Sequence, residues 1–178
     1  MEHLIEIKNL NVEFHTERAV TKALNGVNLT IDAGESVGLV GESGAGKTTT
    51  ALSMLQMLPK PAGRFTDGDI LYKGNSLMKM SERKMTDIRG NKISMIFQNP
   101  LTSLNPVFSV GEQIAMVLRR HRKLGKKEAM KEAQRLMEMV SIPGERFNDY
   151  PVQFSGGMRQ RIGIAAGLAC NTELLIAD

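Results

Sequence analysis

The stretch GESGAGKT, residues Gly41–Thr48, restricts the fold of this chain more than any other part of its sequence. Its three glycines let the backbone turn tightly and leave no side chain in the way of an approaching ligand. The short apolar run Ser36–Val40 precedes it and is typical of a strand buried on both faces. The segment Thr48–Leu58 follows with helical spacing and stops before Pro59. This order of strand, glycine-rich turn and helix predicts an α/β fold.

The same stretch matches the phosphate-binding pattern G-x-x-x-x-G-K-[ST]. Backbone N–H groups in such a turn point inward and bind an anion, and the helix N-terminus adds positive partial charge. We expect Lys47 to be catalytic, as a charge on the β- and γ-phosphates of a nucleotide, and the Thr48 hydroxyl to bind Mg²⁺. The alternative is a chance glycine-rich turn, against which the flanking strand and helix argue. The residues expected to bind the nucleotide here are Gly41, Glu42, Ser43, Gly44, Ala45, Gly46, Lys47, Thr48 and Thr49.

A phosphate loop alone is shared by kinases, GTPases, motor ATPases and transport ATPases. A GTPase would also need a base-reading N-K-x-D motif, which this sequence lacks. A second motif, FSGGMRQR at Phe154–Arg161, precedes a segment rich in Ala and Gly. Ser-Gly-Gly alone is most often a flexible turn, but here it would open a helix whose first N–H groups form a second anion site. Two phosphate sites far apart in one sequence suggest a catalytic site that two chains build together.

The motif at Phe154–Arg161 resembles the signature of ABC-type ATPases, usually L-S-G-G-Q, with Phe154 in place of Leu and Met158 in place of Gln. In that family the signature of one subunit and the phosphate loop of the other enclose one ATP. The resemblance therefore implies that signature residues act on ATP held by a partner subunit. These residues are Ser155, Gly156, Gly157, Met158 and Gln160.

Three further positions carry the resemblance. The stretch SMIFQNPLTSLNP, Ser94–Pro106, is similar to the Q-loop, which implies that Gln98 is catalytic and reaches Mg²⁺ and the attacking water; a plain strand end is the alternative. The stretch LLIAD, ending at Asp178, is similar to a Walker B strand, which implies that Asp178 is a metal-associated carboxylate. Phe14 lies where family members stack an aromatic ring on adenine, and a core phenylalanine is an equally good interpretation.

More narrowly, FQNPLTSLNP and YPVQFSGGMRQR resemble the ATP-binding subunits of bacterial di- and oligopeptide importers and of related nickel importers. The departures are Val152-Gln153, where His-Glu is common, and Ala45, where Ser is usual. The resemblance implies an ATP-binding and ATP-hydrolysing subunit that energises peptide uptake. A nickel importer subunit and a non-hydrolysing nucleotide-binding fragment are the alternatives.

The resemblance also implies cofactors, partners and a location. The cofactors are ATP and Mg²⁺. The partners are a second ATP-binding subunit in a heterodimer, two transmembrane permease subunits and an extracytoplasmic substrate-binding protein. The location is peripheral, on the cytoplasmic face of the bacterial inner membrane.

Composition argues against other classes of protein. No apolar run approaches the roughly 18 residues of a membrane span, and Cys170, the single cysteine, excludes an internal disulfide and a multi-cysteine zinc site within the chain. Basic residues cluster between Arg119 and Arg135, where a solvated helical face is favoured over a surface for nucleic acid or anionic lipid. We expect no nucleic acid partner. An ABC-type ATPase of DNA repair is disfavoured because the segment from Gln98 to Ser155 is too short for a coiled-coil arm.

Hydrophobic periodicity predicts the elements. Strands are expected at Leu4–Phe14 with a break near Asn9, and at Ala23–Ile31, Asp69–Tyr72, Lys92–Phe97 and Glu173–Ala177. Helices are expected after Ser81 and at Val110–Lys123, Lys126–Val140 and Gly156–Ala169. The helix at Lys126–Val140 is expected to place Ala129, Ala133, Leu136, Met137 and Val140 on one apolar face. The implied fold is the ABC-ATPase fold of P-loop NTPases, with a mixed β region, an α/β core and a helical insertion. We expect one nucleotide-binding domain over residues 1–178, with a helical subdomain at about 100–155.

In the family the pattern continues beyond the position of Asp178 with a catalytic Glu, a dimer-forming loop and a switch His. The next strand then lies between the phosphate-loop strand and the Walker B strand. We therefore expect the chain to be a fragment, incomplete at its C-terminus, and hydrolysis to belong to its parent protein.

Overall fold

The computed structural model describes residues 3–99 and 103–178, so that residues 100–102 of the expected Q-loop lie outside the described part. The chain divides into two compact units, Met1–Thr86 and Asp87–Asp178. None of the helices in the described part is long and apolar enough to cross a membrane.

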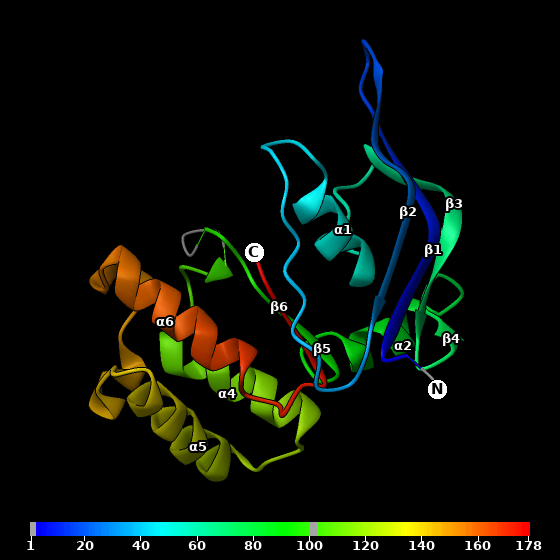
Figure 1. Cartoon of the computed structure of the whole chain (residues 1–178). Coiled ribbons are helices and arrows are strands. Elements are labelled where there is room, and N and C mark those ends of the chain that lie inside the picture. The colour runs from blue at the N-terminus through cyan, green and yellow to red at the C-terminus, as the bar shows by residue number, and fades with distance from the viewer. Residues whose placement is uncertain (1–2, 100–102) are drawn as a thin grey trace. The chain divides into compact units, whose positions relative to one another are not determined.

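The first unit is built on a four-stranded antiparallel sheet in the order β2-β1-β3-β4 (Figure 1). The strands are β1 Ile5–His15, β2 Val20–Ile31, β3 Gly63–Tyr72 and β4 Asn75–Ser76. β1 pairs with both β2 and β3 and supplies the fully buried Ile5, Ile7, Leu10 and Val12. Alternating burial along β1 is the pattern that the sequence predicted.

The expected break in β1 is confirmed at Asn9. Its φ is +45°, and the pairing registers with both neighbouring strands shift beside it. The Asn9 backbone N–H donates to Asn28 Oδ1 at 2.9 Å, and its side-chain amide donates to Asp67 Oδ2 at 3.0 Å. These hydrogen bonds satisfy polar groups that the interrupted ladder leaves without strand partners.

Two helices of this part of the chain begin close to where they were expected. α1 spans Lys47–Met54 and ends four residues earlier than predicted, because the chain turns at Gln56 with φ +50°. α2 spans Glu82–Ile88 and begins after Ser81, whose carbonyl accepts from the N–H of Met85 at 3.0 Å.

The prediction of a buried strand at Ser36–Val40 is wrong. These residues form no strand, and Val37, Leu39 and Val40 are 42%, 50% and 94% exposed. An extended segment becomes a strand only when a neighbour supplies hydrogen bonds, and within the described part of the chain no strand pairs with this one. The apolar composition of this segment favours a strand, but it does not show whether a second strand is available to pair with it.

The second unit contains a two-stranded parallel sheet, β5 Ile93–Ile96 with β6 Leu174–Ala177, paired in the register Ile93 to Leu174. Its helices are α4 Val110–His121, α5 Lys126–Met139 and α6 Gly156–Gly167, with the 3₁₀ helices η1 Gly144–Asn148 and η2 Pro151–Gln153 between α5 and α6 (Figure 1). Each strand and each α-helix of this unit lies within a few residues of its predicted span, whereas the two 3₁₀ helices were not predicted.

One hydrophobic core joins the helices of the second unit. α5 buries the predicted face of Ala129, Ala133, Leu136 and Met137, which repeats every three or four residues. α4 contributes Ile114 and Leu118, and α6 contributes Ile162 and Ala165 to the same cluster. The core therefore fixes α6, and with it the residues at its N-terminus.

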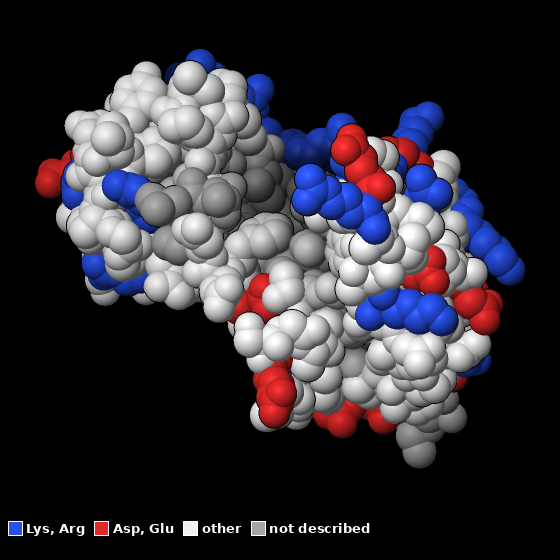
Figure 2. Space-filling model, turned by 90° about the horizontal axis from the view of Figure 1, so that it is seen from above, with Lys and Arg blue, Asp and Glu red and all other residues white. Residues whose placement is uncertain are grey.

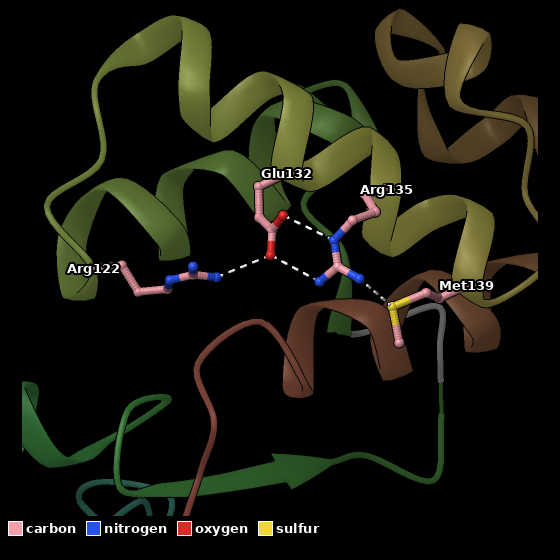
Figure 3. Close-up of polar contacts among 4 residues, drawn as sticks. All are labelled: Arg122, Glu132, Arg135 and Met139. Carbon is pink, nitrogen blue, oxygen red and sulfur yellow. Dashed lines mark hydrogen bonds and ion pairs between the residues drawn. The ribbon is translucent and has the colours of Figure 1, made fainter.

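An ion-pair network links the end of α4 to α5. Figure 3 shows the Glu132 carboxylate between two guanidinium groups. Glu132 Oε1 lies 3.0 Å from Arg122 Nη1 and 2.9 Å from Arg135 Nη2, and Arg135 Nη1 also donates to Met139 Sδ at 3.2 Å. The hydrogen bond from Arg135, with that from Arg122 in support, lowers the pKa of Glu132 to about 2.

The basic segment between Arg119 and Arg135 has the features of a solvated helical face. Arg119 pairs with Glu112 at 3.4 Å, and Arg120 lies 3.7 Å from Asp87. On the face of the molecule drawn in Figure 2, which labels no residue of this segment, Lys and Arg side chains lie among uncharged and acidic ones. Exposed pairs of this kind contribute little to stability.

Candidate functional site

The glycine-rich loop has the backbone conformation that a phosphate cradle requires. Gly44 and Gly46 have φ values of +82° and +89°, in the left-handed region that side chains disfavour. At Gly46 a Cβ would lie 2.7 Å from Leu24 Cδ2 and 2.8 Å from the Ala23 carbonyl oxygen, so the loop packs directly on β2. Residues 41–45 are exposed, which leaves the loop open to a ligand.

Lys47 lies across this loop. Its Nζ donates to the carbonyl oxygens of Gly41 at 2.6 Å and Glu42 at 2.7 Å, which holds the ammonium over the turn. α1 begins at Lys47 with no acidic residue in its first turn, so nothing there opposes the positive end of its dipole. Thr48 is exposed in the same turn, and Thr49 follows it. Loop, lysine and helix N-terminus therefore present positive charge in one place, where phosphate oxygens would fit.

Phe14 lies in the same unit, on β1, and is half-buried. It pairs with Thr21 and Gly63 on the neighbouring strands, and its ring would lie 3.1 Å from a Cβ on Gly63. This half-buried position agrees with a core phenylalanine. Its stacking on adenine stays a prediction.

The predicted signature residues stand at a helix N-terminus, as expected. Ser155 is the N-cap of α6, with φ −64° and ψ 163°, and its Oγ accepts from the Met158 N–H at 3.4 Å. Gly156 and Gly157 are exposed, and a Cβ on either would meet nothing within 4 Å. The first turn of α6 contains no acidic residue. The open glycines and free first N–H groups form a surface that suits an anion.

Gln98 and Asp178 lie at the same edge of the parallel sheet. β5 and β6 run side by side, Asp178 directly follows β6, and its N–H donates to the Ile96 carbonyl at 3.0 Å. Gln98 lies two residues beyond β5, and both side chains are exposed. The carboxyl ends of neighbouring parallel strands thus bring together two of the three predicted metal ligands.

The oxygen atoms of these side chains are the kind that Mg²⁺ prefers. Thr48 offers a hydroxyl in the first unit, while Gln98 and Asp178 offer an amide and a carboxylate in the second. Among the residues that the structure describes, no three His, Cys, Asp or Glu side chains gather into a metal-binding cluster. A small number of protein ligands is consistent with a Mg²⁺ site, because Mg²⁺ usually keeps several waters and is also bound by substrate phosphates.

Two arginines that the sequence did not single out support the signature. Arg159 Nε donates to the Phe154 carbonyl at 2.9 Å. The Arg146 guanidinium carbon lies 4.0 Å from the centroid of the Phe154 ring. The partners of Arg146 lie only three to eight residues on, at Asp149, Gln153 and Phe154, but these turns between α5 and α6 have no periodic pattern that marks the contact.

Comparison with known proteins agrees with this geometry. The sequence pattern of the family described as ABC transporter matches residues 24–178. The chain is 48% identical over 177 residues to a probable peptide ABC transporter ATP-binding protein, y4tR of Sinorhizobium fredii strain NGR234, covering 98% of this chain and 53% of that protein. It is also 48% identical to the oligopeptide transport ATP-binding protein OppD of Bacillus subtilis, covering 98% of this chain and 49% of that one. The chain spans about half the length of the curated relatives it matches.

Solved structures share the fold. The ATP-binding cassette MJ0796, in a dimeric post-hydrolysis state bound to ADP and Pi, superposes with a TM-score of 0.86 at 28% identity, covering 98% of this chain and 73% of that one. The cassette cbiO1 from Clostridium perfringens, part of the transporter complex cbiONQ, gives a TM-score of 0.72 at 23% identity, covering 100% and 66%, and supports the fold alone. The expected α/β cassette fold is confirmed, and the chain belongs to the ABC transporter family.

Proposed function

We propose that this chain is the nucleotide-binding part of an ATP-hydrolysing subunit that drives peptide import. The observation that supports this proposal most strongly is the phosphate loop at Gly41–Thr48, where Lys47 is held over the turn and α1 begins. The peptide substrate is supported by the relatives' names, which describe peptide and oligopeptide transport. In this proposal residues 1–178 form one nucleotide-binding domain with a helical subdomain at about 100–155.

The chain's own residues account for ATP binding. N–H groups of the loop donate to the phosphate oxygens, and the Lys47 ammonium exchanges its carbonyl partners for the β- and γ-phosphates. The residues proposed to hold Mg²⁺ are Thr48, Gln98 and Asp178. When bound, the ion would neutralise charge on the phosphates as the γ-phosphoryl group leaves.

Hydrolysis is proposed to need two subunits. The N–H groups at Ser155–Gly157 would stabilise the γ-phosphate of an ATP held by the partner's phosphate loop, because they offer a second anion site far from Lys47 in sequence. Gln98 would orient the attacking water. The dimeric state of MJ0796 supports such an arrangement.

The further partners are two permease subunits and a substrate-binding protein, with the ATPase on the cytoplasmic face of the membrane. The segment after Gln98 and the helices α4 and α5 would contact the permease. ATP binding between two ATPase subunits would close them and rearrange the permease, and hydrolysis would reset it.

The first test is equilibrium binding of ATP, with Mg²⁺, to this chain. We expect a dissociation constant in the micromolar range and a loss of about tenfold or more in Lys47→Ala, since a hydrogen-bonded charge on phosphate contributes about 1.5–3 kcal/mol. Lys79→Ala, at an exposed lysine of the same unit, is the matched control and should bind like the wild type.

Equal ATP affinity in Lys47→Ala and Lys79→Ala would contradict the proposal. Turnover is tested in the full-length gene product with its partner subunits, where Ser155→Ala should abolish hydrolysis and leave ATP binding by the single chain intact. Peptide-stimulated turnover in reconstituted transporter tests the substrate class, and stimulation by nickel alone would point to the other importer type.

A further inference from the structure

The backbone that leads into the signature helix is clamped from two sides. Phe154, directly before Ser155, is buried, with 2% of its surface exposed. Arg159 Nε donates to its carbonyl at 2.9 Å, and Arg146 stacks over its ring at 4.0 Å. Arg146 Nη2 also donates to the carbonyl of Gln153 at 3.1 Å. Two consecutive residues before the N-cap are therefore held through both backbone and side chain.

Arg146 is itself held in place. Its Nε donates to Asp149 Oδ2 at 2.7 Å, which occupies one edge of the planar guanidinium and leaves its face free to stack. It lies in the 3₁₀ helix η1, where the N–H of Asp149 donates to the Arg146 carbonyl at 3.0 Å. Its side chain is 28% exposed, against 56% for Arg135 on α5. The planar fork thus meets a carboxylate, a carbonyl and an aromatic face at once, which a lysine cannot do.

The held segment decides where the anion-binding groups point. Ser155 caps α6 in an extended conformation, and Gly156 and Gly157 open into free space. Neither glycine has a side chain that could fix its own position. The core holds the body of α6, and the backbone at Gln153 and Phe154 holds the entry to its first turn. The direction of these N–H groups depends on both, and small errors in such placement are costly in catalysis.

We infer that Arg146 is a positioning residue for the signature motif: it fixes Gln153 and Phe154 so that the N–H groups of Ser155–Gly157 meet the γ-phosphate of ATP bound to a partner subunit. This inference rests on the proposed function. Arg146 does not touch the nucleotide. Its effect is on the hydrolytic step, because ATP first binds to the phosphate loop of the other subunit.

The test compares Arg146→Gln with Arg135→Gln in the full-length gene product assembled with its partner subunits. Both variants remove a guanidinium that pairs with a carboxylate three residues away in sequence, but Arg135 contacts Glu132 and Met139 and nothing of the signature. We expect Arg146→Gln to lower kcat by about tenfold or more and to leave the KM for ATP within about twofold. Arg135→Gln should keep kcat within about twofold.

Amide hydrogen exchange distinguishes a local effect on the start of α6 from a general loss of stability, which would speed exchange in α5 as well. In Arg146→Gln the amides of Met158 and Arg159, which bond back to Ser155, should exchange faster, while those of α5 stay unchanged. A kcat of Arg146→Gln equal to that of the wild type would overturn the inference. So would a loss of kcat in both variants that simply follows how far each one lowers the melting temperature. If Arg146→Gln does not fold, Arg146→Lys keeps the positive charge but lacks the planar fork that meets Gln153 and Phe154 together, and unchanged kcat there overturns the inference equally.

The two proposals fail separately. If wild-type turnover does not depend on Ser155, the proposed function fails and the inference with it. If turnover depends on Ser155 but is indifferent to Arg146, the function stands and only the positioning role is lost.

Discussion

At Gly46 the backbone excludes every other residue for two independent reasons. Its φ of +89° is unfavourable for a side chain, and a Cβ would overlap Leu24 Cδ2 and the Ala23 carbonyl oxygen. We predict that Gly46→Ala lowers the free energy of unfolding of the first unit by about 3 kcal/mol or more and weakens ATP binding. Chemical denaturation and ATP titration measure the two effects.

Gly44→Ala is the matched control for that prediction. Its φ is +82°, but a Cβ there meets nothing within 4 Å, so only the conformational cost remains. That cost is about 1–2 kcal/mol. A loss of stability in Gly46→Ala no larger than in Gly44→Ala would show that the loop does not pack on β2 as described.

Glu132 gives a pH dependence whose direction follows from its neighbours. Its pKa is lowered from 4.5 to about 2, first by the hydrogen bond from Arg135. The ionised form therefore stabilises the fold above about pH 4.5, and this contribution is lost as the pH falls toward 2. We predict that Glu132→Gln lowers the free energy of unfolding by about 1 kcal/mol at pH 7, and by progressively less between pH 4.5 and 2.

Urea denaturation across that pH range checks the prediction. Glu138→Gln is the control, because Glu138 is an exposed carboxylate of the same helix that forms no ion pair with the described residues. A difference between Glu132→Gln and wild type that stays constant as the pH falls would mean that Arg135 and Arg122 do not hold the carboxylate ionised.

Among the helices, Gly111 of α4 is a position where helix propensity favours alanine but packing against a neighbouring side chain opposes it. Replacing a helical glycine by alanine gains at most about 1 kcal/mol. A Cβ at Gly111 would, however, lie 2.1–2.6 Å from ring atoms of Phe147 in η1. Overpacking a core costs about 1–3 kcal/mol, so we predict that Gly111→Ala destabilises the second unit. Thermal unfolding of the variant measures the net effect.

Gly163 of α6 offers the opposite case. A Cβ there would have Ser103 Oγ at 3.7 Å as its nearest neighbour, an ordinary contact. Gly163→Ala should therefore stabilise the unit by up to about 1 kcal/mol. Adding Phe147→Leu to Gly111→Ala should recover part of the lost stability, and the packing argument fails if both alanines shift the melting temperature alike.

The helices also show how far periodicity reaches. The buried face of α5, from Ala129 to Met137, was predicted because its spacing is a property of the helix itself. The ends of helices were predicted less well. α1 ends at Met54 because Gln56 adopts a positive φ, and a glutamine gives no local sign of that turn.

On the scale of the whole molecule, strand formation depends on partners. Residues 36–40 have the apolar composition of a buried strand, yet within the described part of the chain no strand pairs with them. We predict that amides 37–40 exchange with solvent at least about 100-fold faster than those of Ile7 and Val12 in β1, because an unpaired segment opens at little free-energy cost. Hydrogen–deuterium exchange with fragment mass analysis resolves the two regions. Equal protection would mean that the segment finds a strand partner in solution.

The sequence by itself determined the features that depend on neighbours along the chain. The phosphate loop, the N-cap at Ser155 and the buried face of α5 each need only a local spacing of residue types, so each could be predicted. The sequence also predicted the strands that Gln98 and Asp178 follow, and these strands pair side by side.

Only the tertiary structure decided the features that depend on residues brought together from a distance. Phe147 fills the space beside Gly111, Arg146 stacks on Phe154, and the segment at 36–40 stays outside the sheet. Periodicity reports which face of an element is apolar, but not which element will cover it. A local pattern therefore fixes what a residue can do, while packing and strand pairing fix whether a partner is there to meet it.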